Sequence, residues 1–528
     1  MTDPQAHQSA SEPKHWHLFL AAHTNVGKTA LLRTLLGQDV GEVADAADVT
    51  QGITAHELAR DAEGQTLSLW DTPGFGDSHR LAQRLRIRAG WLRWLVCEGW
   101  DRWRTPALWR AQRLVQTLKR QADVVLYPVS LLERPHDAVY VAPELEVLRW
   151  AGQPVLVILN QGGSLAPQAA REARLAEWRA ALAQHEIVRA VVDLDAFSRC
   201  WLQELSLFKE IGLVLPQATR GAYQALAQQI KQSHLDRFAA SCQAVAACVL
   251  HTAQDRCELD RPETGRLSEA LGQLRERLPW GESSSKRCAE QAMTALAQRL
   301  SQRTQDLAAQ LIALHRLEGV GVADVMDLSA QSWRVKGPVD TASTSVVGGL
   351  ISGLMTGLGA DLMAGGLTLG AGAVVGGVLG ALGAAALTKG YNVITHQDHQ
   401  VVRWSPQSLE ELLTKCVHLY LGVAHFGRGQ GQWQKKAAAT TWADATEAEI
   451  QGHHAALQAL WAKADAAQDD REAQGQWQAA LQALVEAILR GVLQRLYPDM
   501  AALLSPYTAL GTPPAAATMP GHAQLRHD

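Results

Sequence analysis

Three residues near the N-terminus have the types and the order of a phosphate-binding loop. In AAHTNVGKTALL, residues 21–32, Gly27, Lys28 and Thr29 stand where the pattern Gly-x-x-x-x-Gly-Lys-[Ser/Thr] requires them. Backbone N–H groups of such a loop cradle phosphates, the lysine ammonium reaches the β- and γ-phosphates, and the hydroxyl holds Mg²⁺. Ala22 replaces the first glycine, which only ends a strand and begins the turn. The expected nucleotide-binding residues of the loop are Ala22, His23, Thr24, Asn25, Val26, Gly27, Lys28 and Thr29.

A second motif, Asp71-Thr72-Pro73-Gly74, follows an apolar run and has the D-x-x-G form of P-loop nucleotide hydrolases. There Asp71 would hold Mg²⁺ through water, and the N–H of Gly74 would sense the γ-phosphate. Between the motifs, Thr54 can meet the metal only when the γ-phosphate is present, as a switch residue does. A turn for D-T-P-G and a strand start for Thr54 are the simpler alternatives, but three motifs in order predict a nucleotide site. The expected metal ligands are Thr29, Thr54 and Asp71, and the expected catalytic residues are Asn25, Lys28 and Thr54.

A phosphate cradle must follow a strand and open a helix, and the flanking residues satisfy both conditions. Residues 17–22 are apolar enough for the strand, and residues 28–36 form an amphipathic helix with Gly37 as its stop. Residues 14–215 alternate apolar runs with helical stretches, which predicts an α/β domain with a mostly parallel sheet. The expected strands are His17–Ala22, Thr66–Trp70, Val124–Val129, Val155–Leu159 and Ile187–Val192.

The remainder of the chain has the periodicity of helices. The expected helices are Gln217–Leu259, Lys286–His315, Leu409–Leu421, Glu447–Ala467 and Gln476–Leu496. We therefore expect a disordered N-terminus (1–13), the α/β domain (14–215) with a helical insertion (77–121), a helical domain (216–345), a Gly-rich block (346–388), a second helical domain (389–504) and a disordered tail (505–528).

Composition excludes several classes of protein. The chain has 528 residues, 47% of them hydrophobic, so it is folded rather than disordered, and its net charge of −4 gives no case for a nucleic-acid partner. Seven cysteines without a C-x-x-C pair favour reduced thiols over a metal or disulfide framework. The N-terminus is polar and has no secretory signal, so we expect a chain that faces the cytoplasm.

The motifs resemble those of a known group of proteins. HTNVGKT (23–29), GIT (52–54) and DTPGFGDS (71–78) are similar to the Era, MnmE and septin-like GTPases. The chain as a whole resembles uncharacterised bacterial P-loop GTPases with a C-terminal helical domain of unknown function, on the basis of SWRVKG (332–337), AHFGRGQGQW (424–433) and the Gly-rich block. The resemblance implies a G domain that binds GTP or GDP with Mg²⁺ and hydrolyses GTP.

The base-recognition motif departs from this group. Asn160 is retained from N-K-x-D, but Gln161 replaces the lysine and Gly163 replaces the aspartate that accepts two hydrogen bonds from guanine. Asp193 or Asp195 could substitute, although each is more typical of a helix cap. The residues therefore predict binding of a nucleoside triphosphate, whereas only the resemblance implies that its base is guanine.

The residue that would orient the attacking water for hydrolysis is also missing. Phe75 stands where Ras-like enzymes have the glutamine that orients water. Asn25 matches an asparagine that binds K⁺ in Era- and MnmE-like enzymes, where the cation takes the place of an arginine finger. The alternative is that Asn25 only suits the backbone angles of the turn. A nucleotide-binding switch or scaffold with little hydrolysis stays open as a second function.

Two further segments suggest binding surfaces. The insertion 77–121 interleaves five tryptophans with arginines, and we favour packing of these rings into the core over binding of nucleic acid or a membrane surface. In 346–387 glycines recur every fourth residue and the only ionisable residue is Asp361, so we expect a membrane hairpin of transmembrane helices with Gly-zipper packing. A buried soluble helix pair is its alternative.

Together these features predict a membrane-associated GTPase switch on the cytoplasmic side of the cell membrane, with a soluble cytoplasmic protein as the alternative. A membrane-remodelling or pore-forming protein that self-associates under control of its G domain is a third class.

Overall fold

The chain divides into two compact units in the computed structural model. The first comprises residues 1–235, 427–433 and 502–528, and the second comprises residues 236–426 and 434–501. The structure describes residues 13–23, 26–37, 53–87, 100–162, 168–196, 200–259, 282–317, 391–395, 400–425, 436–464, 471–507 and 510.

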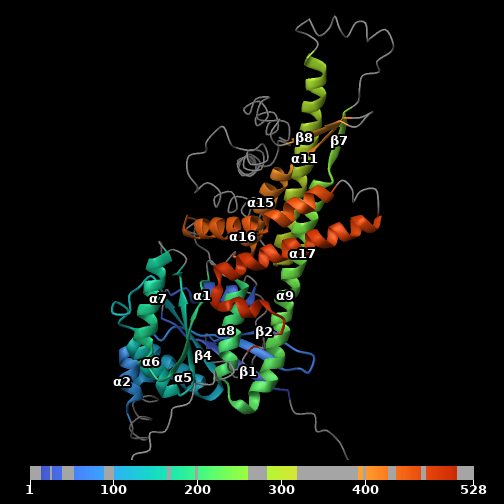
Figure 1. Cartoon of the computed structure of the whole chain (residues 1–528). Coiled ribbons are helices and arrows are strands. Elements are labelled where there is room, and N and C mark those ends of the chain that lie inside the picture. Colours follow the sequence, from blue (N-terminus) through green and yellow to red (C-terminus); the bar gives the residue numbers. More distant parts are fainter. Residues whose placement is uncertain are drawn as a thin grey trace, which may run out of the picture. The chain divides into compact units, whose positions relative to one another are not determined.

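A six-stranded sheet in the order β2-β3-β1-β4-β5-β6 forms the centre of the first unit (Figure 1). Neighbouring strands are parallel except β2 and β3. The strands are β1 His15–Leu20, β2 Thr54–Arg60, β3 Thr66–Asp71, β4 Val124–Ser130, β5 Val155–Asn160 and β6 Val188–Asp193. The prediction of an α/β domain with a mostly parallel sheet is thereby confirmed. The strands expected from apolar runs did not include β2, because this edge strand is only partly buried and lacks such a run. The alternative for Thr54, a strand start, is confirmed, since β2 begins at this residue.

One face of the sheet in the first unit packs into an apolar core. Every residue of β4 and β5 is buried, as continuous apolar runs in a parallel sheet predict. The core includes the stacked rings of Phe19 and Trp70, with centroids 5.1 Å apart, and the buried faces of α2, α5, α6 and α7. The helices are α1 Lys28–Leu36, α2 Ser78–Leu85, α4 Arg102–Arg104, α5 Pro106–Gln121, α6 Val141–Ala151, α7 Gln168–Leu182 and α8 Trp201–Val214.

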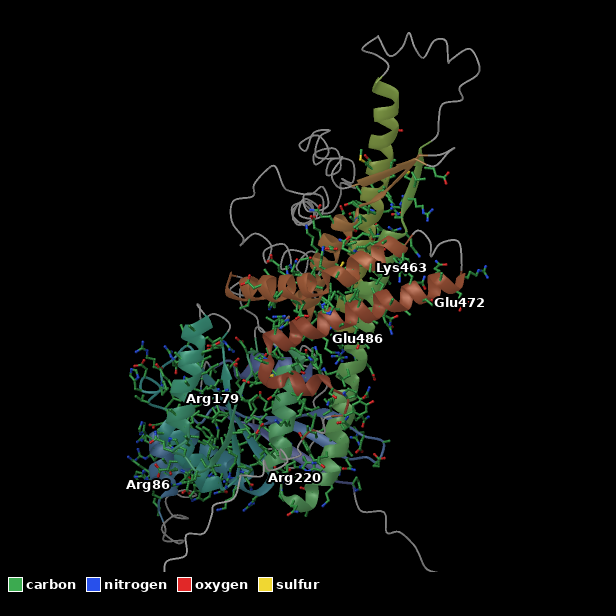
Figure 2. All side chains as sticks on the ribbon, viewed as in Figure 1. Arg86, Arg179, Arg220, Lys463, Glu472 and Glu486 are labelled. Carbon is green, nitrogen blue, oxygen red and sulfur yellow. The ribbon has the colours of Figure 1, made fainter. Side chains whose placement is uncertain are left out.

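A turn after α8 leads into the long helix α9, Gln217–Ala253, whose residues belong to both units. Arg220, labelled in Figure 2, donates hydrogen bonds to the carbonyls of Leu213 and Leu215 at 2.8 and 3.0 Å. These bonds satisfy carbonyls that the end of α8 leaves without helical partners, so they fix the turn.

The second unit confirms the expected helical region, which is 66% helical. Besides the end of α9, its described helices are α11 Glu282–Leu314, α15 Pro406–Ala424, α16 Lys436–Lys463, α17 Arg471–Leu496 and the 3₁₀ helix η4 Pro498–Leu504, which continues into the first unit. It also contains an antiparallel sheet in the order β7-β9-β8, formed by Arg256–Leu259, Gln400–Trp404 and Tyr391–Thr395. The helix expected over Gln217–Leu259 therefore ends earlier. Long-range pairing such as Arg256 with Arg403 makes β7, and no local pattern reveals it.

A buried histidine joins two helices of the second unit. His425 follows α15 and is 3% exposed. Its Nδ1–H donates to the carbonyl of Leu421 at 2.8 Å, and its Nε2 accepts from the Tyr497 hydroxyl at 2.7 Å. Burial lowers the pKa of His425 from 6.5 to about 4. The neutral imidazole is the form that satisfies both partners.

The expectation of transmembrane helices is corrected. Among the helices in the described residues, none is long and apolar enough to cross a membrane. The Gly-rich block at 346–388, on which the expectation depended, lies outside the described residues.

Candidate functional site

The phosphate-binding loop lies between β1 and α1. Gly27 is the N-cap of α1 and has φ +82°, a conformation that only glycine adopts without strain. A Cβ at this position would lie 2.6 Å from Nδ2 of Asn160, so close approach of the two segments also requires glycine. Gly37 ends α1 in a left-handed conformation, as expected. Thr24 and Asn25 lie outside the described residues.

Lys28 and Asp71 join the first motif to the second. The Lys28 ammonium donates to Oδ1 of Asp71 at 2.7 Å and also to the carbonyl of Thr72. The Thr72 hydroxyl in turn donates to the carbonyl of Leu20 at 2.9 Å, which ties the end of β3 to the end of β1. Because β1 and β3 are parallel neighbours with Leu20 opposite Asp71, their carboxyl ends bring the two motifs together.

The expected metal ligands come from three elements around this edge. Thr29 is exposed in the first turn of α1, and Thr54 begins β2 directly opposite Asp71 in the ladder. Within the described part of the chain, no three His, Cys, Asp or Glu side chains gather as a metal site. A single carboxylate with hydroxyls nevertheless fits Mg²⁺, which binds oxygen and takes its other ligands from phosphates and water.

Asn160 holds two loops of the site together. Its Nδ2 donates to the carbonyl of Val26 at 2.9 Å, and its Oδ1 accepts from the backbone N–H of Ala196 at 2.9 Å. The residue is fully buried. The Thr34 hydroxyl adds a 3.0 Å bond from α1 to the carbonyl of Ala196. The retained asparagine therefore fixes the phosphate-binding loop to the segment that follows β6.

The altered base motif has its own local structure. Gln161 has φ +64° and accepts a 2.7 Å hydrogen bond from the Ser130 hydroxyl through Oε1, while Gly163 lies outside the described residues. Asp193 binds Arg171 of α7 through both carboxylate oxygens at 2.6 Å. Neither Asp193 nor Asp195 is the N-cap residue of α8, which is Cys200.

The loop after D-x-x-G places Phe75 in the core rather than over the site. Phe75 is 2% exposed and belongs to the core cluster, while Gly74 beside it is half-buried. Asp77 caps α2 by accepting from the N–H of Arg80 at 3.0 Å. No water-orienting group therefore comes from position 75.

Comparisons with known proteins identify both parts of the chain. Residues 18–161 match the family model described as 50S ribosome-binding GTPase. Residues 179–489, more than half of the chain, match the model described as domain of unknown function DUF3482. The chain belongs to the DUF3482 family. Its N-terminal part is a P-loop GTPase domain.

Individual relatives match only part of this DUF3482 protein, which in turn spans less than two thirds of their length. The tRNA modification GTPase MnmE of Chromobacterium violaceum is 30% identical over 86 residues, which are 16% of this chain and 19% of MnmE. Era of Aquifex aeolicus bound to GDP·AlF4⁻ is 21% identical with a TM-score of 0.26, covering 39% of this chain and 58% of that one. Era in complex with MgGDPNP and a segment of 16S ribosomal RNA is 20% identical with the same TM-score and coverage.

A polar network that sequence analysis missed connects the loop of this DUF3482 protein to β4 and α6. His23 Nδ1 lies 2.8 Å from Oε1 of Glu144, and the Tyr127 hydroxyl donates to the other carboxylate oxygen at 2.7 Å. The His23 ring also stacks on Tyr140, with centroids 4.2 Å apart. Burial raises the pKa of Glu144, whereas the hydrogen bonds from Tyr127 and His23 lower it.

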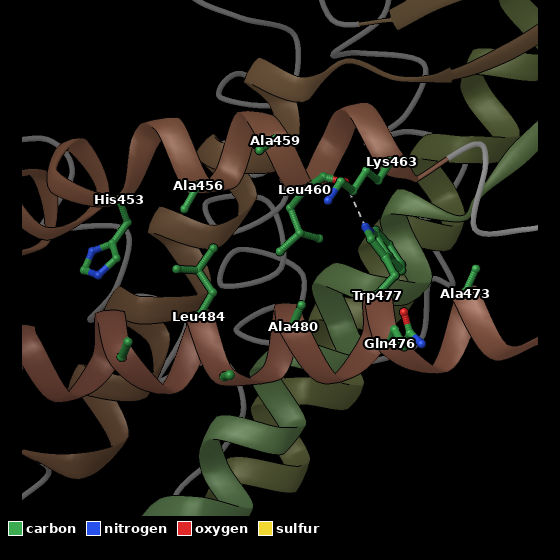
Figure 3. A pocket seen from close by; sticks show the side chains of 12 residues that line it. His453, Ala456, Ala459, Leu460, Lys463, Ala473, Gln476, Trp477, Ala480 and Leu484 are labelled. Atoms are coloured by element: carbon green, nitrogen blue, oxygen red, sulfur yellow. Dashed lines mark hydrogen bonds between the residues drawn. The ribbon is translucent and has the colours of Figure 1, made fainter.

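The second unit contains an apolar groove between α16 and α17 of about 830 Å³ (Figure 3). Alanines form half of its lining, with His453 and Lys463 on α16 and Gln476 on α17 as polar side chains. Trp477 Nε1 donates to the carbonyl of Leu460 at 2.8 Å, which joins the two helices. The groove carries no cluster of metal-binding residues among the described ones.

The tryptophans of the insertion differ from the favoured expectation. Trp100 and Trp103 are 60% and 82% exposed, and Trp109 is half-buried. Trp91 and Trp94 lie outside the described residues. The described rings therefore do not fill the core, which apolar side chains from the sheet and helices already occupy.

Proposed function

We propose that the chain binds GTP with Mg²⁺ at its phosphate-binding loop, hydrolyses the GTP slowly and acts as a molecular switch. The contact of Lys28 with Asp71 carries this proposal, because it puts an ammonium, a carboxylate and a helix N-terminus at one edge of the sheet. The GTPase family match and the GTPase activity named for MnmE favour guanine as the base.

On binding, the Lys28 ammonium would exchange its bond to Asp71 for bonds to the β- and γ-phosphates. Asp71 would then be released to hold Mg²⁺ through water, with the hydroxyls of Thr29 and Thr54 as further ligands. Mg²⁺ would neutralise phosphate charge at this position. The N–H of Gly74 and the hydroxyl of Thr54 would sense the γ-phosphate, and Asn160 would keep the loop beside the segment after β6.

The test is direct binding of fluorescent GTP and ATP to the full-length chain. Lys28→Ala should weaken triphosphate binding by about 100-fold or more, since charge-assisted hydrogen bonds to phosphate are lost. Lys209→Ala, which removes a lysine of α8, is the matched control and should bind like the parent. Equal affinity of Lys28→Ala and the parent would refute the nucleotide site, and competition by unlabelled nucleotides identifies the base.

The position of Phe75 favours a second candidate, a nucleotide-binding switch with little hydrolysis. Its apolar ring is buried and cannot orient water. Single-turnover hydrolysis distinguishes the two candidate functions. A hydrolysis rate above background that rises with nucleotide occupancy supports the GTPase, whereas bound GTP that stays intact supports the nucleotide-binding switch with little hydrolysis.

We further propose that the protein associates with the cytoplasmic side of the cell membrane through residues 346–388, with self-association in its GTP state. The near absence of ionisable residues in this segment supports the proposal. After a high-salt wash, which weakens electrostatic binding, deletion of 346–388 should move the protein from the membrane fraction to the soluble fraction and leave nucleotide binding intact. A parent chain that fractionates as a soluble, monodisperse protein without detergent would refute it.

A further inference from the structure

Part of the insertion exposes tryptophan and arginine side chains together. Trp103 is 82% exposed and Trp100 is 60% exposed, which is unusual for so large an apolar ring. Guanidinium groups lie over neighbouring rings: Arg104 over Trp100 at 5.5 Å, and Arg102 and Arg113 over Trp109 at 5.7 and 5.9 Å. The Trp/Arg surface is defined as Trp100, Arg102, Trp103, Arg104, Trp109 and Arg113.

A buried carboxylate holds this surface on the G domain. Asp101 is fully buried and accepts hydrogen bonds from the Thr105 hydroxyl at 3.1 Å and from Gln112 Nε2 at 2.8 Å. Arg84 of α2 lies 3.1 Å from the same carboxylate. Asp101 therefore fastens α4 to both α2 and α5. The exposed rings on either side of it are positioned before any partner arrives, so less conformational entropy is lost on binding.

The exposed charge of the stretch has one sign. Residues 100–121 contain five arginines and one lysine, and Asp101 is their only acidic residue. Because Asp101 is buried and bonded to Arg84, the exposed side chains of this stretch present only positive charge. This contrasts with the net charge of −4 for the whole chain.

We propose that the Trp/Arg surface binds the headgroup region of an anionic phospholipid bilayer. Tryptophan suits this region because its ring enters the acyl boundary while its N–H stays at the level of the headgroups. Arginine guanidinium groups bind lipid phosphates in a bidentate manner. Each basic residue close to an anionic bilayer strengthens binding roughly fivefold, and the effect falls off within a Debye length.

A single-stranded nucleic acid fits the same surface less well. Bases bind such proteins by stacking on open aromatic faces. Here guanidinium groups already lie over Trp100 and Trp109, and Trp103 projects with most of its surface in solvent. One projecting ring surrounded by arginines is suited to insertion between headgroups rather than to a stacked row of bases.

The inference goes beyond the proposed function, since the surface lies in the described part of the G domain and needs neither bound GTP nor residues 346–388. It also needs no helix that crosses the bilayer. Failure of the nucleotide site would abolish GTP binding, whereas failure of this inference would leave GTP binding intact and change only lipid binding.

The test is co-sedimentation of the full-length chain with vesicles of phosphatidylcholine alone or with about one-third phosphatidylglycerol. We expect the parent to bind the anionic vesicles at least about tenfold more tightly, and this gain to shrink in high salt. Arg102→Gln with Arg104→Gln should lower the affinity for anionic vesicles by roughly 20-fold. Trp100→Ser with Trp103→Ser should lower it by about tenfold at either salt concentration.

Matched controls change the same charge or apolarity elsewhere on the G domain. Arg179→Gln with Arg189→Gln removes two exposed arginines, and Val139→Ser removes an exposed apolar side chain. These controls should bind vesicles like the parent, and every variant should keep its affinity for fluorescent GTP as evidence of folding. Binding that does not depend on phosphatidylglycerol, or Trp/Arg variants that bind like the parent, would overturn the inference. So would tighter binding of the parent to a single-stranded oligonucleotide than to anionic vesicles, if the same variants abolish it.

Discussion

The ammonium of Lys28, the first residue of α1, lies 2.7 Å from the carboxylate of Asp71, the last residue of β3. Both side chains are mostly buried, with 19% and 26% of their surfaces exposed. The charges of Lys28 and Asp71 neutralise each other, so the Lys28 side chain is held at the loop without a bound anion. A triphosphate must compete with Asp71 for this ammonium, and Mg²⁺ must compete with Lys28 for the carboxylate.

This competition predicts that Asp71→Asn has opposite effects on the affinity for GTP without Mg²⁺ and on the gain in affinity that Mg²⁺ brings. Without Mg²⁺, the variant should bind GTP as tightly as the parent or up to about tenfold more tightly, because Lys28 loses its charged competitor. With Mg²⁺, the gain in affinity should shrink by about tenfold or more. Titration of fluorescent GTP with excess chelator and with excess Mg²⁺ measures both. Asp137→Asn, an exposed control in the loop after β4, should keep the full Mg²⁺ response, and an undiminished response in Asp71→Asn would argue against its metal role.

Asn160→Ala should damage both stability and nucleotide binding. The variant leaves the carbonyl of Val26 and the N–H of Ala196 without their buried partner. The loss of two buried hydrogen bonds costs about 2–4 kcal/mol in the free energy of unfolding. Urea unfolding measures this cost, and Gln153→Ala, which loses one exposed bond to the carbonyl of Lys119, should cost below about 1 kcal/mol. Similar costs for the two variants would contradict the role of Asn160 as a link between loops.

Gly27→Ala and Gly37→Ala separate backbone strain from steric contact. Both glycines have positive φ, at +82° and +67°, so alanine is strained by about 1 kcal/mol at either position. Only at Gly27 would the new Cβ meet a neighbour, Nδ2 of Asn160 at 2.6 Å, whereas the space around Gly37 is open. We expect Gly27→Ala to lower GTP affinity by about tenfold or more and Gly37→Ala to lower thermal stability only. Nucleotide titration and thermal melting of both variants check this, and equal GTP affinities would exclude the steric argument.

Potassium should raise hydrolysis if Asn25 helps to hold a cation beside the phosphates. With Phe75 buried, a cation is one way to supply the positive charge that stabilises the transition state. Single-turnover rates should rise by about tenfold or more when K⁺ replaces Na⁺ at constant ionic strength. Asn25→Ala should remove the response while changing GTP affinity less. Equal rates in the two salts, well above background, would rule out the potassium mechanism.

His425 predicts a loss of stability on mild acidification. Its pKa is about 4 in the folded chain and 6.5 when exposed, so the unfolded chain binds more protons between these values. Stability is therefore full above pH 6.5 and falls as the pH drops toward 4, by about 2 kcal/mol between pH 7 and pH 5. His425→Gln should remove this part of the pH dependence of unfolding. His136→Gln, at an exposed position, should leave it unchanged, and a parent whose pH dependence matches that of His425→Gln would contradict the assignment.

Local chemistry made part of the fold predictable. The apolar runs that became β1, β3, β4 and β5 are mostly or fully buried strands, whose composition differs from that of their neighbours, and the run that became β6 forms a half-buried edge strand. The edge strand β2 is not among the expected apolar runs because it is only partly buried, and β7 escaped prediction because its pairing with the distant strand β9 determines it. The positions of Trp100 and Trp103 also escaped prediction. Their apolarity predicted a place in the core, but other apolar side chains fill the core and the two rings are exposed.

By itself, the sequence determined that a phosphate-binding loop follows a strand and opens a helix, because Gly27, Lys28 and Thr29 are fixed by local spacing. It also identified Asp71, Gly74 and Asn160 as candidates, since each follows an apolar run. Only the tertiary structure decided that Lys28 contacts Asp71, that Asn160 joins Val26 to Ala196 and that His23 meets Glu144. The physical reason is that hydrogen bonds between side chains far apart in the sequence depend on strand order and register, which the packing of the whole core sets.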